Sequence, residues 1–313
     1  MIFGAMSDLH FTDKTPENRK EGYSKEQFKK FERALKIVNK TDSKLLLVGG
    51  DIFEVATAPY SLVYRLMKLL NKYKEIQICV VPGQHDLRYH VTGLKNTPLG
   101  ILIKAGYATL LSNLAPTEYY LKGCEKPLTI IGAGWNEEPE AHADVVVTHR
   151  MVCYKKPLWP GQKDFSTAKA LLKKWSWAKC IISGDNHLLH VADFADKGLQ
   201  INCGSLMRST KSQVDHRPSV WLIDSEDWSY KRKKLKVLPS EEAFDFAKIE
   251  KAEEAEKAKE QASQDMDEFI NSLSVKDSER PKYKEVLKKV IEKRNPNKNV
   301  RDIINLVMEE AEK

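Results

Sequence analysis

Short apolar runs alternate with stretches of helical periodicity over about the first 240 residues of the sequence. The runs are four to six residues long, as is typical of strands buried on both faces. Residues 25–40 and 60–73 instead repeat their apolar side chains at helical spacing. This alternation predicts an α/β domain. Its expected strands are Ile2–Ser7, Leu45–Val48, Ile78–Val81, Leu128–Ile131, Val145–Thr148 and Cys180–Ser183, followed by an antiparallel hairpin of Pro218–Asp224 and Tyr230–Leu238.

The composition changes after Leu238, where charged and alanine-rich helical patterns replace the β-rich runs. The expected helices are Ser240–Ser263, Asp265–Leu273, Pro281–Arg294 and Asn299–Glu312. We therefore divide the chain into a body (1–238), a charged helical linker or reduced cap (239–280) and a helix pair (281–313). A pair this small does not bury both of its apolar stripes, so it must dock on the body, on a second copy or on another protein.

The charge is unevenly spread along the chain. Residues 1–238 hold 36 Lys and Arg against 25 Asp and Glu, a net of +11, whereas residues 239–313 hold 15 against 19, a net of −4. A basic body favours a polyanionic partner, although surplus lysine also serves solubility alone.

Several classes of protein are disfavoured by the composition. The sequence has no apolar stretch near the eighteen residues that a membrane span needs, and MIFGAMSDLHF has no features of a secretory signal. The five cysteines are scattered and form no CxxC pair, which argues against a disulfide framework or a thiolate zinc site. We expect a protein of the reducing cytoplasm with no membrane partner.

Polar, metal-ligating side chains follow five of the predicted strands at the point where each strand ends. In open α/β sheets, ligands bind in the crevice beyond these carboxyl ends. Alone, each segment is more typical of a turn or a capping pair than of a metal site. The segments are Ser7-Asp8-Leu9-His10, Gly49-Gly50-Asp51, Gly83-Gln84-His85-Asp86, Thr148-His149 and Gly184-Asp185-Asn186-His187.

The order D-x-H, GGD, G-x-H-D, a lone His and G-x-x-H resembles the calcineurin-like metallophosphoesterases from Met1 to about Leu238. This resemblance implies a four-layer αββα sandwich, with two mixed β-sheets flanked by helices, plus a helical C-terminal tail. A finer resemblance is to SbcD-type nuclease subunits of DNA double-strand-break repair, including phage-encoded versions. It rests on GDIF at Gly50–Phe53, GQHD followed by Leu87-Arg88, and NCGSLMR at Asn202–Arg208.

The family pattern implies two metal ions bridged by Asp51. The first would be held by Asp8, His10, Asp51 and His187, and the second by Asp51, Gln84, His149 and Asp185. Two such ions activate a water for in-line attack and neutralise the charge that builds on the phosphate. His85 would protonate the leaving oxygen or stabilise the phosphate charge.

Two departures from the family fall on the second metal. Gln84 stands where asparagine is usual, and Asp185 stands where histidine is usual. An oxygen-rich second site suits Mn²⁺ or Mg²⁺ more than Zn²⁺, so we interpret the centre as retuned. Glu54 is a third departure, at a position where histidine is frequent. Its carboxylate would orient His85 and raise the pKa of that histidine, or it would be a solvated residue at a helix start.

Six residues are candidates for contacts with the substrate. Arg88 and Arg208 would clamp phosphates, and Ser205 would donate a hydrogen bond beside the metals. Lys155 and Lys156 would contact phosphates without reading sequence, and Trp159 would stack on an unpaired base. The alternative is that the tryptophans of this region belong to the core and its lysines are solvated.

The leading hypothesis is a Mn²⁺-dependent DNA nuclease, an exonuclease or endonuclease, that forms the catalytic subunit of an SbcCD-type complex. The resemblance implies a homodimer joined through helices at residues 60–73 and near 98–105. It also implies an SMC-like ATPase of the SbcC type bound to residues 281–313. Its location would be cytoplasmic, in the host if the chain is phage-encoded. The alternatives are a stand-alone phosphodiesterase or phosphatase, and a DNA-binding scaffold with a weakened metal site.

Overall fold

The computed structural model describes residues 1–90, 93–120, 126–194, 197–273, 283–294, 296, 300, 301 and 304. The chain forms two compact units, Met1–Phe246 and Ala247–Lys313, and each is considered by itself. The sequence predicts three parts, with boundaries after residues 238 and 280. These parts were assigned by their expected functions as well as by their structure, and the division stays a prediction.

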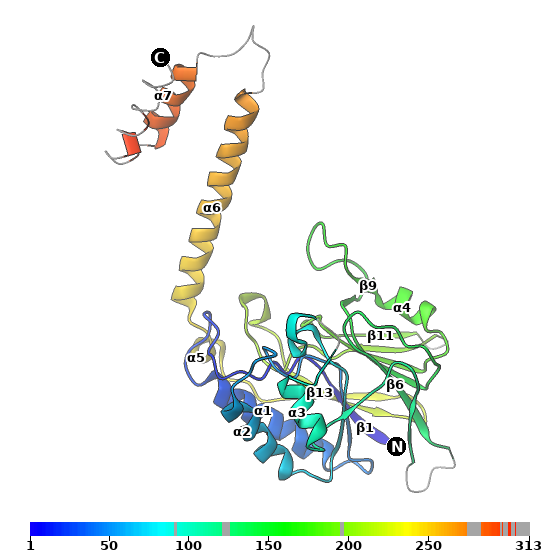
Figure 1. Cartoon of the computed structure of the whole chain (residues 1–313). Helices are drawn as coiled ribbons and strands as arrows, with labels where there is room; N and C mark the ends of the chain where they lie inside the picture. The colour runs from blue at the N-terminus through cyan, green and yellow to red at the C-terminus, as the bar shows by residue number, and fades with distance from the viewer. Residues whose placement is uncertain are drawn as a thin grey trace. The chain divides into compact units, whose positions relative to one another are not determined.

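Two six-stranded mixed sheets form the centre of the first unit (Figure 1). In the first sheet, β1 to β4 run parallel, and the hairpin of β13 and β14 joins antiparallel to β1. Its order is β14 (Tyr230–Lys234), β13 (Ser219–Asp224), β1 (Ile2–Met6), β2 (Leu45–Val48), β3 (Gln77–Val80) and β4 (Thr109–Leu110).

The second sheet repeats this plan with antiparallel strands at both edges. Its order is β11 (His190–Phe194), β12 (Gly198–Asn202), β10 (Cys180–Gly184), β7 (Val145–His149), β6 (Leu128–Ala133) and β5 (Thr117–Tyr119). A small ribbon pairs β8 (Val152–Cys153) with β9 (Ser166–Thr167).

Helices cover the outer faces of both sheets. The first sheet is covered by α1 (Tyr23–Val38), α2 (Tyr60–Asn71) and α3 (Pro98–Lys104), and the second by α4 (Ala168–Lys174). The short helix α5 (Ser240–Ala243) follows the hairpin. Three short 3₁₀ turns, Gln84–Asp86, Arg88–His90 and Lys211–Gln213, lie in the loops.

Alternation along the strands separates three hydrophobic cores. In β2, Leu46 and Val48 face the helices, while Leu45 and Leu47 face the second sheet. In β10, Ile181 turns outward to the α4 side. Because successive side chains of a strand point to opposite faces, an unbroken apolar run must be buried on both. The layers are therefore helix, sheet, sheet and helix, which confirms the predicted αββα sandwich.

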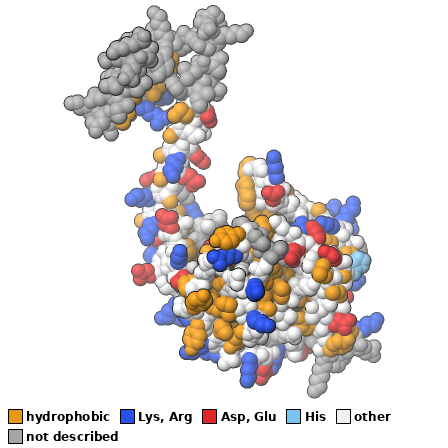
Figure 2. Space-filling model, in the orientation of Figure 1, with side chains coloured by type: hydrophobic (Ala, Val, Ile, Leu, Met, Phe, Trp, Pro, Cys, Tyr) orange, Lys and Arg blue, Asp and Glu red, His pale blue; other side chains and the backbone are white. Residues whose placement is uncertain are grey.

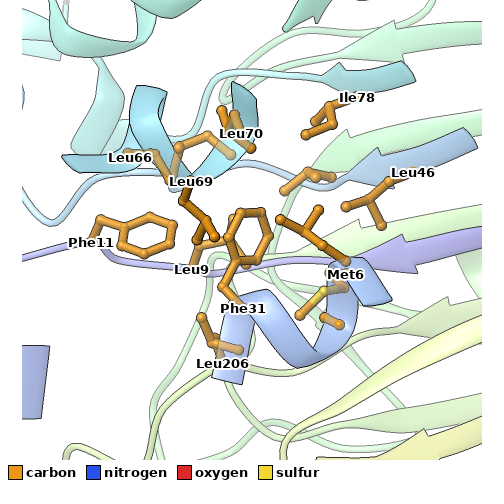
Figure 3. Close-up of a cluster of buried hydrophobic side chains, with 14 of the residues drawn as sticks. Met6, Leu9, Phe11, Phe31, Leu46, Leu66, Leu69, Leu70, Ile78 and Leu206 are labelled. Carbon is orange, nitrogen blue, oxygen red and sulfur yellow. The ribbon is translucent and has the colours of Figure 1, made fainter. Parts of the chain in front are cut away.

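The core beneath α1 and α2 fixes the loops that leave the first sheet (Figure 3). Leu9 and Phe11, which flank His10 in the sequence, are buried among Phe31 and Leu66 in this core. The segment after β1 is therefore held from both sides of His10 by apolar contacts. Packing of this kind is what gives a polar loop a fixed position.

The six predicted strands are all present, with ends that differ by no more than a few residues. The sequence pattern missed β11 and β12, whose residues are only partly apolar. It also missed α4 and the short strands β4, β5, β8 and β9. Of these elements, β4, β5 and β11 lie at the edges of the sheets, where tertiary pairing decides the conformation more than local pattern does.

The C-terminal region differs from its prediction at two points. Phe244 is extended and fully buried, so the helix expected from Ser240 is broken between α5 and α6. Helix α6 (Phe246–Leu273) then runs through residue 264 without a break, since neither Gly nor Pro interrupts it. Helix α7 (Tyr283–Arg294) agrees with its prediction, whereas most of the expected helix 299–312 lies outside the described residues. No helix among the described residues is long and apolar enough to cross a bilayer.

Candidate metal centre

The predicted ligands meet at the carboxyl ends of parallel strands from both sheets. Strand β1 leads to Asp8 and His10, β2 to Asp51, and β3 to the turn with Gln84 and His85. From the second sheet, β7 ends in His149, and β10 leads to Asp185 and His187. The sandwich thus brings together residues that are up to 179 positions apart in the sequence.

The backbone is strained at four of these positions. Asp8, His10, Asp51 and Asp185 have φ values of 51°, 48°, 50° and 75°. Only four other non-glycine residues in the described ranges have positive φ. A non-glycine residue in this region costs of order 1 kcal/mol or more and persists where the surroundings impose it. Such a concentration of strain marks a functional site.

Two glycines let the loops approach one another closely. A Cβ on Gly50, which has a φ of 91°, would overlap with the imidazole of His149. A Cβ on Gly83 would overlap with the carboxylate of Asp51. The GGD and GQHD segments therefore need glycine for the side chains of the centre to converge.

The first half of the centre consists of Asp8, His10 and His187. The Nε2 atoms of His10 and His187 lie 3.0 Å apart, and Nε2 of His187 lies 3.9 Å from Oδ1 of Asp8. Oδ2 of Asp8 accepts a hydrogen bond of 2.5 Å from Ser7 Oγ. These three side chains offer ligand atoms within 4.8 Å of one another, which is the spacing of a metal site.

The second half consists of Gln84, His149 and Asp185. The amide Nε2 of Gln84 donates a hydrogen bond of 3.0 Å to Oδ1 of Asp185, and that oxygen lies 4.0 Å from Nε2 of His149. Nδ1 of His149 contacts the carbonyl oxygen of Gly49 at 2.7 Å. Because a carbonyl only accepts, Nδ1 carries a proton, and Nε2 is the nitrogen that a metal would bind once the imidazole is neutral.

Asp51 stands between the two halves. Its Oδ2 lies 3.6 Å from Nε2 of His10 and 3.4 Å from Nε2 of His149. Its other oxygen accepts a hydrogen bond of 3.0 Å from the backbone N–H of His85. The carboxylate is thus fixed through Oδ1 and directs Oδ2 toward both halves.

The arrangement fits divalent metal ions. Three buried atoms, Asp51 Oδ2, Gln84 Oε1 and His149 Nε2, have no hydrogen-bond partner among the described residues. Buried polar atoms are almost always paired, so these three suit the coordination of a cation. Two nitrogens bound to one ion at about 2.1 Å, at right angles, lie about 3.0 Å apart. That is the separation of the His10 and His187 Nε2 atoms.

Electrostatics support the same reading. Burial alone would lower the pKa of both central histidines, but the nearby carboxylates outweigh it. Glu54 and Asp51 raise the pKa of His10 to about 9, and Asp51 raises that of His149 to about 10. Burial would raise the pKa of Asp51, yet His149 and His10 hold it well below its usual value. Without metal, protons neutralise this carboxylate cluster, and a divalent cation would take their place.

His85 has a different environment from the ligands. Its Nδ1 contacts the backbone carbonyl of Glu54 at 2.7 Å, and its ring stands edge-on to that of His10, with centroids 5.0 Å apart. Nδ1 therefore carries the proton, and the other ring nitrogen is left for the substrate.

Glu54 has a different contact from the one predicted. Its carboxylate lies 3.1 Å from Nδ1 of His10, and only its carbonyl reaches His85. The cause is a bridge between Phe11 and Phe53, which aligns the segments after β1 and β2 and places Glu54 beside His10. Glu54 is thus a positioning group for a ligand.

Two supporting groups, Ser7 and the carbonyl of Gly49, were missed by the sequence analysis. Ser7 and the carbonyl of Gly49 hold Asp8 and His149. Asp86, which is fully buried, accepts hydrogen bonds from the backbone N–H groups of Ile52, Phe53 and Gly83. Burial raises the pKa of Asp86 to about 6, since the N–H donors offset it only in part. Ser7 adjoins a predicted ligand, but a carbonyl partner has no signal in a sequence.

Four of the predicted substrate contacts lie at the surface. Lys155, Lys156 and Trp159 are exposed in the loop between β8 and β9, which projects from the sandwich (Figure 1). Trp159 is 53% exposed, so it is not part of the core. Arg88 is exposed and lies over the ring of Tyr89. Their roles in substrate binding stay predictions.

Arg208 and Ser205 occupy places that do not suit the predicted contacts. Arg208 is fully buried, and its guanidinium donates to the carbonyls of Val214 and Leu238 and to Ser240 Oγ. Ser205 Oγ donates to the carbonyl of Met207. The guanidinium of Arg208 is therefore not available to bind a phosphate. Its hydrogen bonds connect the segment after β14 to the loop after β12. Ser205 stabilises that same loop.

This geometry agrees with comparisons to known proteins. The sequence model of the calcineurin-like phosphoesterase family matches residues 1–189. The chain belongs to this family. It is accordingly a metal-dependent phosphoester hydrolase, and the clusters around Asp8, His10 and Asp51 supply the ligand groups that such chemistry needs.

Solved structures with a related fold share little sequence with this phosphoesterase. One is an archaeal phosphodiesterase with 15% identity and a TM-score of 0.40, over 75% of this chain and 100% of that chain. Another is a dimetal phosphatase from Danio rerio with 12% identity and a TM-score of 0.45, over 75% of this chain and 96% of that chain. Scores this low add nothing on function. No curated protein matches the sequence.

Proposed function

We propose that this phosphoesterase is a two-metal DNA nuclease and the catalytic subunit of an SbcCD-type complex. The observation that best supports a metal-dependent hydrolytic centre concerns Oδ2 of Asp51. This atom is buried, has no hydrogen-bond partner among the described residues and lies within 3.6 Å of two imidazole nitrogens. One ion would be held by Asp8, His10, Asp51 and His187, and the other by Asp51, Gln84, His149 and Asp185. Bound ions would polarise the phosphate and supply an activated water.

The metals proposed are Mn²⁺ or Mg²⁺. Around the second ion, Gln84 would offer an amide oxygen and Asp51 and Asp185 carboxylates, so oxygen donors outnumber the single nitrogen donor, His149. Hard divalent cations prefer such donors, whereas Zn²⁺ favours nitrogen and sulfur. Gln84 Oε1 would satisfy its missing contact by coordination.

His85 is proposed as the general acid. Its Nδ1–H is fixed on the carbonyl of Glu54, so its second nitrogen, Nε2, is the one that faces a substrate. Protonated there, the imidazole would donate a proton to the departing sugar oxygen or a hydrogen bond to the phosphate. The role matters most when the leaving group is a poor one, such as a deoxyribose oxygen.

DNA is the proposed substrate because the body carries a net charge of +11, and its projecting loop holds Lys155, Lys156 and Trp159. Basic side chains bind phosphates without reading sequence, and an exposed aromatic ring stacks on any base.

A homodimer and an ATPase partner are part of the same proposal. Tyr60 and Tyr64 of α2 are 84% and 66% exposed, and Ile101 of α3 is 38% exposed. Figure 2 shows hydrophobic side chains gathered on the face that carries α2 and α3. We propose that two copies meet through these helices, and that residues 281–313 bind an SMC-like ATPase in the cytoplasm. Deletion of residues 281–313 is then expected to abolish ATPase binding and leave the metal content unchanged.

The test compares wild type with His85→Ala in Mn²⁺, on labelled linear DNA, circular single strands and p-nitrophenyl phosphate esters. We expect DNA cleavage that falls about 100-fold in the variant, while metal content stays the same. The nitrophenolate esters need little protonation, so their hydrolysis should change much less. His142→Ala, at an exposed histidine stacked on Trp177, is the matched control.

Other outcomes would replace the proposal. Cleavage of the small esters alone, with or without the ATPase and ATP, would indicate a stand-alone phosphodiesterase or phosphatase. DNA binding without any hydrolysis under these conditions would indicate a scaffold with a weakened metal site.

A further inference from the structure

A strongly basic groove lies between α1 and α2, outside the metal centre. It is a hollow of about 250 Å³ lined by Lys25, Lys29, Arg65, Lys68 and Lys72, with Phe28, Glu32 and Leu69. All five cationic side chains are exposed, whereas Phe28 and Leu69 are at least half-buried and form its apolar floor. We call these five cations and the floor between them the basic groove.

The positive charge of the basic groove is mostly unneutralised. Glu32 is its sole acidic lining residue, and its Oε1 lies 3.9 Å from both Lys36 and Lys72. The same oxygen accepts a hydrogen bond from Tyr73. Within the described residues, Lys25, Lys29, Arg65 and Lys68 have no carboxylate partner. Lysines that merely solvate a surface are usually interspersed with acids, and this group is not.

The cations form two rows with a regular spacing. Lys25 and Lys29 are one helical turn apart on α1, which separates them by about 6 Å along the axis. Lys68 and Lys72 repeat that step on α2. Arg65 closes one end, where its guanidinium lies 4.3 Å above the ring of Phe28. This stacking leaves the edge of the guanidinium, with its N–H donors, available to an anion.

One end of the basic groove lies at the edge of the sheet that carries the metal centre. Helices α1 and α2 follow the parallel strands β1 and β2, so their N-termini lie at the carboxyl ends of those strands. Lys25 lies in the first turn of α1, Arg65 from the middle of α2 donates a hydrogen bond to the adjacent Ser24, and Lys72 follows the far end of α2. The basic groove thus leads away from the catalytic edge.

We propose that the basic groove binds the phosphodiester backbone of one DNA strand on its way to or from the metal centre. This rests on the proposed nuclease function. A polyanion with evenly spaced charges fits two rows in which successive cations are one helical turn apart. An acidic peptide fits less well, because its charges are irregular and its backbone N–H groups would meet no acceptor on cationic side chains.

The basic groove is compatible with a dimer through α2. At 100° per residue, Tyr60 and Tyr64 lie on one side of α2, whereas Lys68, Lys72 and Arg65 lie about 60°, 100° and 120° further around the helix. The two surfaces are adjacent but separate. A dimer that covers the tyrosines would leave both rows of cations open to a strand.

The experiment reverses two charges in the basic groove. The Lys29→Glu/Lys68→Glu variant of the full chain is compared with Lys231→Glu/Lys234→Glu, which reverses two exposed lysines on the edge strand β14. The probe is a fluorescent single strand of about 30 nucleotides, in EDTA to prevent hydrolysis. We expect the groove variant to raise the dissociation constant about 10-fold or more, with a shallower salt dependence, and the control to change it about 2-fold. Hydrolysis of bis-p-nitrophenyl phosphate in Mn²⁺ should be equal in all three proteins.

Equal losses in the two variants would overturn the proposal, because the effect would then come from net charge alone. Competition by polyglutamate as effective as by unlabelled DNA would also overturn it, in favour of an acidic protein partner. If wild type hydrolyses only small esters while groove-dependent DNA binding holds, the nuclease proposal fails and the basic groove stands. If DNA is hydrolysed and the groove variant binds it normally, the groove proposal alone fails.

Discussion

The two halves of the metal centre are held in different ways. In the first half, two of the three side chains contact separate supports, Ser7 for Asp8 and Glu54 for His10. In the second half, two of the side chains support each other, since Gln84 donates to Asp185. Gln84 and Asp185 are two of the three positions at which the sequence departs from the family pattern, and both belong to this half. We therefore interpret the two departures as coupled. The longer amide side chain of Gln84 is paired with the carboxylate of Asp185, which accepts its N–H.

The largest effect is expected from the residue that joins the halves. Asp51→Asn removes the charge that faces both His10 and His149, so neither half should retain its ion. Phosphodiester hydrolysis should fall roughly 1000-fold, and manganese content should fall below one ion per chain. Elemental analysis with a rate assay checks both, and Asp193→Asn, at an exposed carboxylate, is the control. Retention of one tightly bound ion would show that the halves are independent.

In the second half, one substitution should weaken metal binding and a second should restore it. Gln84→Asn shortens the side chain and removes the hydrogen bond to Asp185, so affinity for the second ion should fall about 10-fold. The double variant Gln84→Asn/Asp185→His should recover most of that affinity and shift the preference from Mn²⁺ toward Zn²⁺. Calorimetric titration with each metal is the measurement. Additive losses in the double variant would contradict the pairing.

The first half should respond to its own support and leave the second half unchanged. Glu54→Gln keeps the size of the side chain but removes the negative charge beside Nδ1 of His10. We expect a loss of roughly 5-fold in affinity for the first ion, since such outer contacts raise the basicity of a ligating histidine. Titration by manganese electron paramagnetic resonance separates the two binding steps. A loss confined to the second step would reverse the assignment of the halves.

The two central histidines also tie metal binding to pH. The metal-free chain holds His10 with a pKa of about 9 and His149 with a pKa of about 10, so both are protonated at pH 7. A metal requires the neutral imidazole, and binding must therefore release protons. Apparent metal affinity should rise as the pH increases from 7 toward 9, and calorimetry in buffers of different ionisation enthalpy should show net proton release. Affinity independent of pH over this range would contradict these pKa values.

The proximity of the candidate ligands could be predicted because each one follows a strand that an apolar run already reveals. Because these strands are parallel within their sheets and end at the same side of the sandwich, the fold brings Asp8, Asp51 and His149 together. The supports depend on contacts between loops instead. Glu54 reaches His10 only because Phe11 pairs with Phe53, and no local pattern records that bridge.

The errors at Arg208 and in the C-terminal helix share a physical cause. Phe244 is fully buried between the guanidinium groups of Arg19 and Arg208, at 4.9 and 5.4 Å. This packing draws the segment after β14 onto the body, which buries Arg208 and interrupts the helix expected from Ser240. Long-range packing of this single aromatic ring therefore decided two outcomes. It determined the position of Arg208 against the expectation from the NCGSLMR motif, and the break in the helix against the expectation from helical periodicity.

The most direct test of the two-halved centre is anomalous diffraction at the manganese edge from crystals of the Mn²⁺-loaded full chain. We expect two peaks, one on either side of Asp51. One should lie within bonding distance of the His10 and His187 nitrogens, and the other should bond to His149 and to the amide oxygen of Gln84. A single peak, or a second ion that Gln84 does not touch, would contradict it.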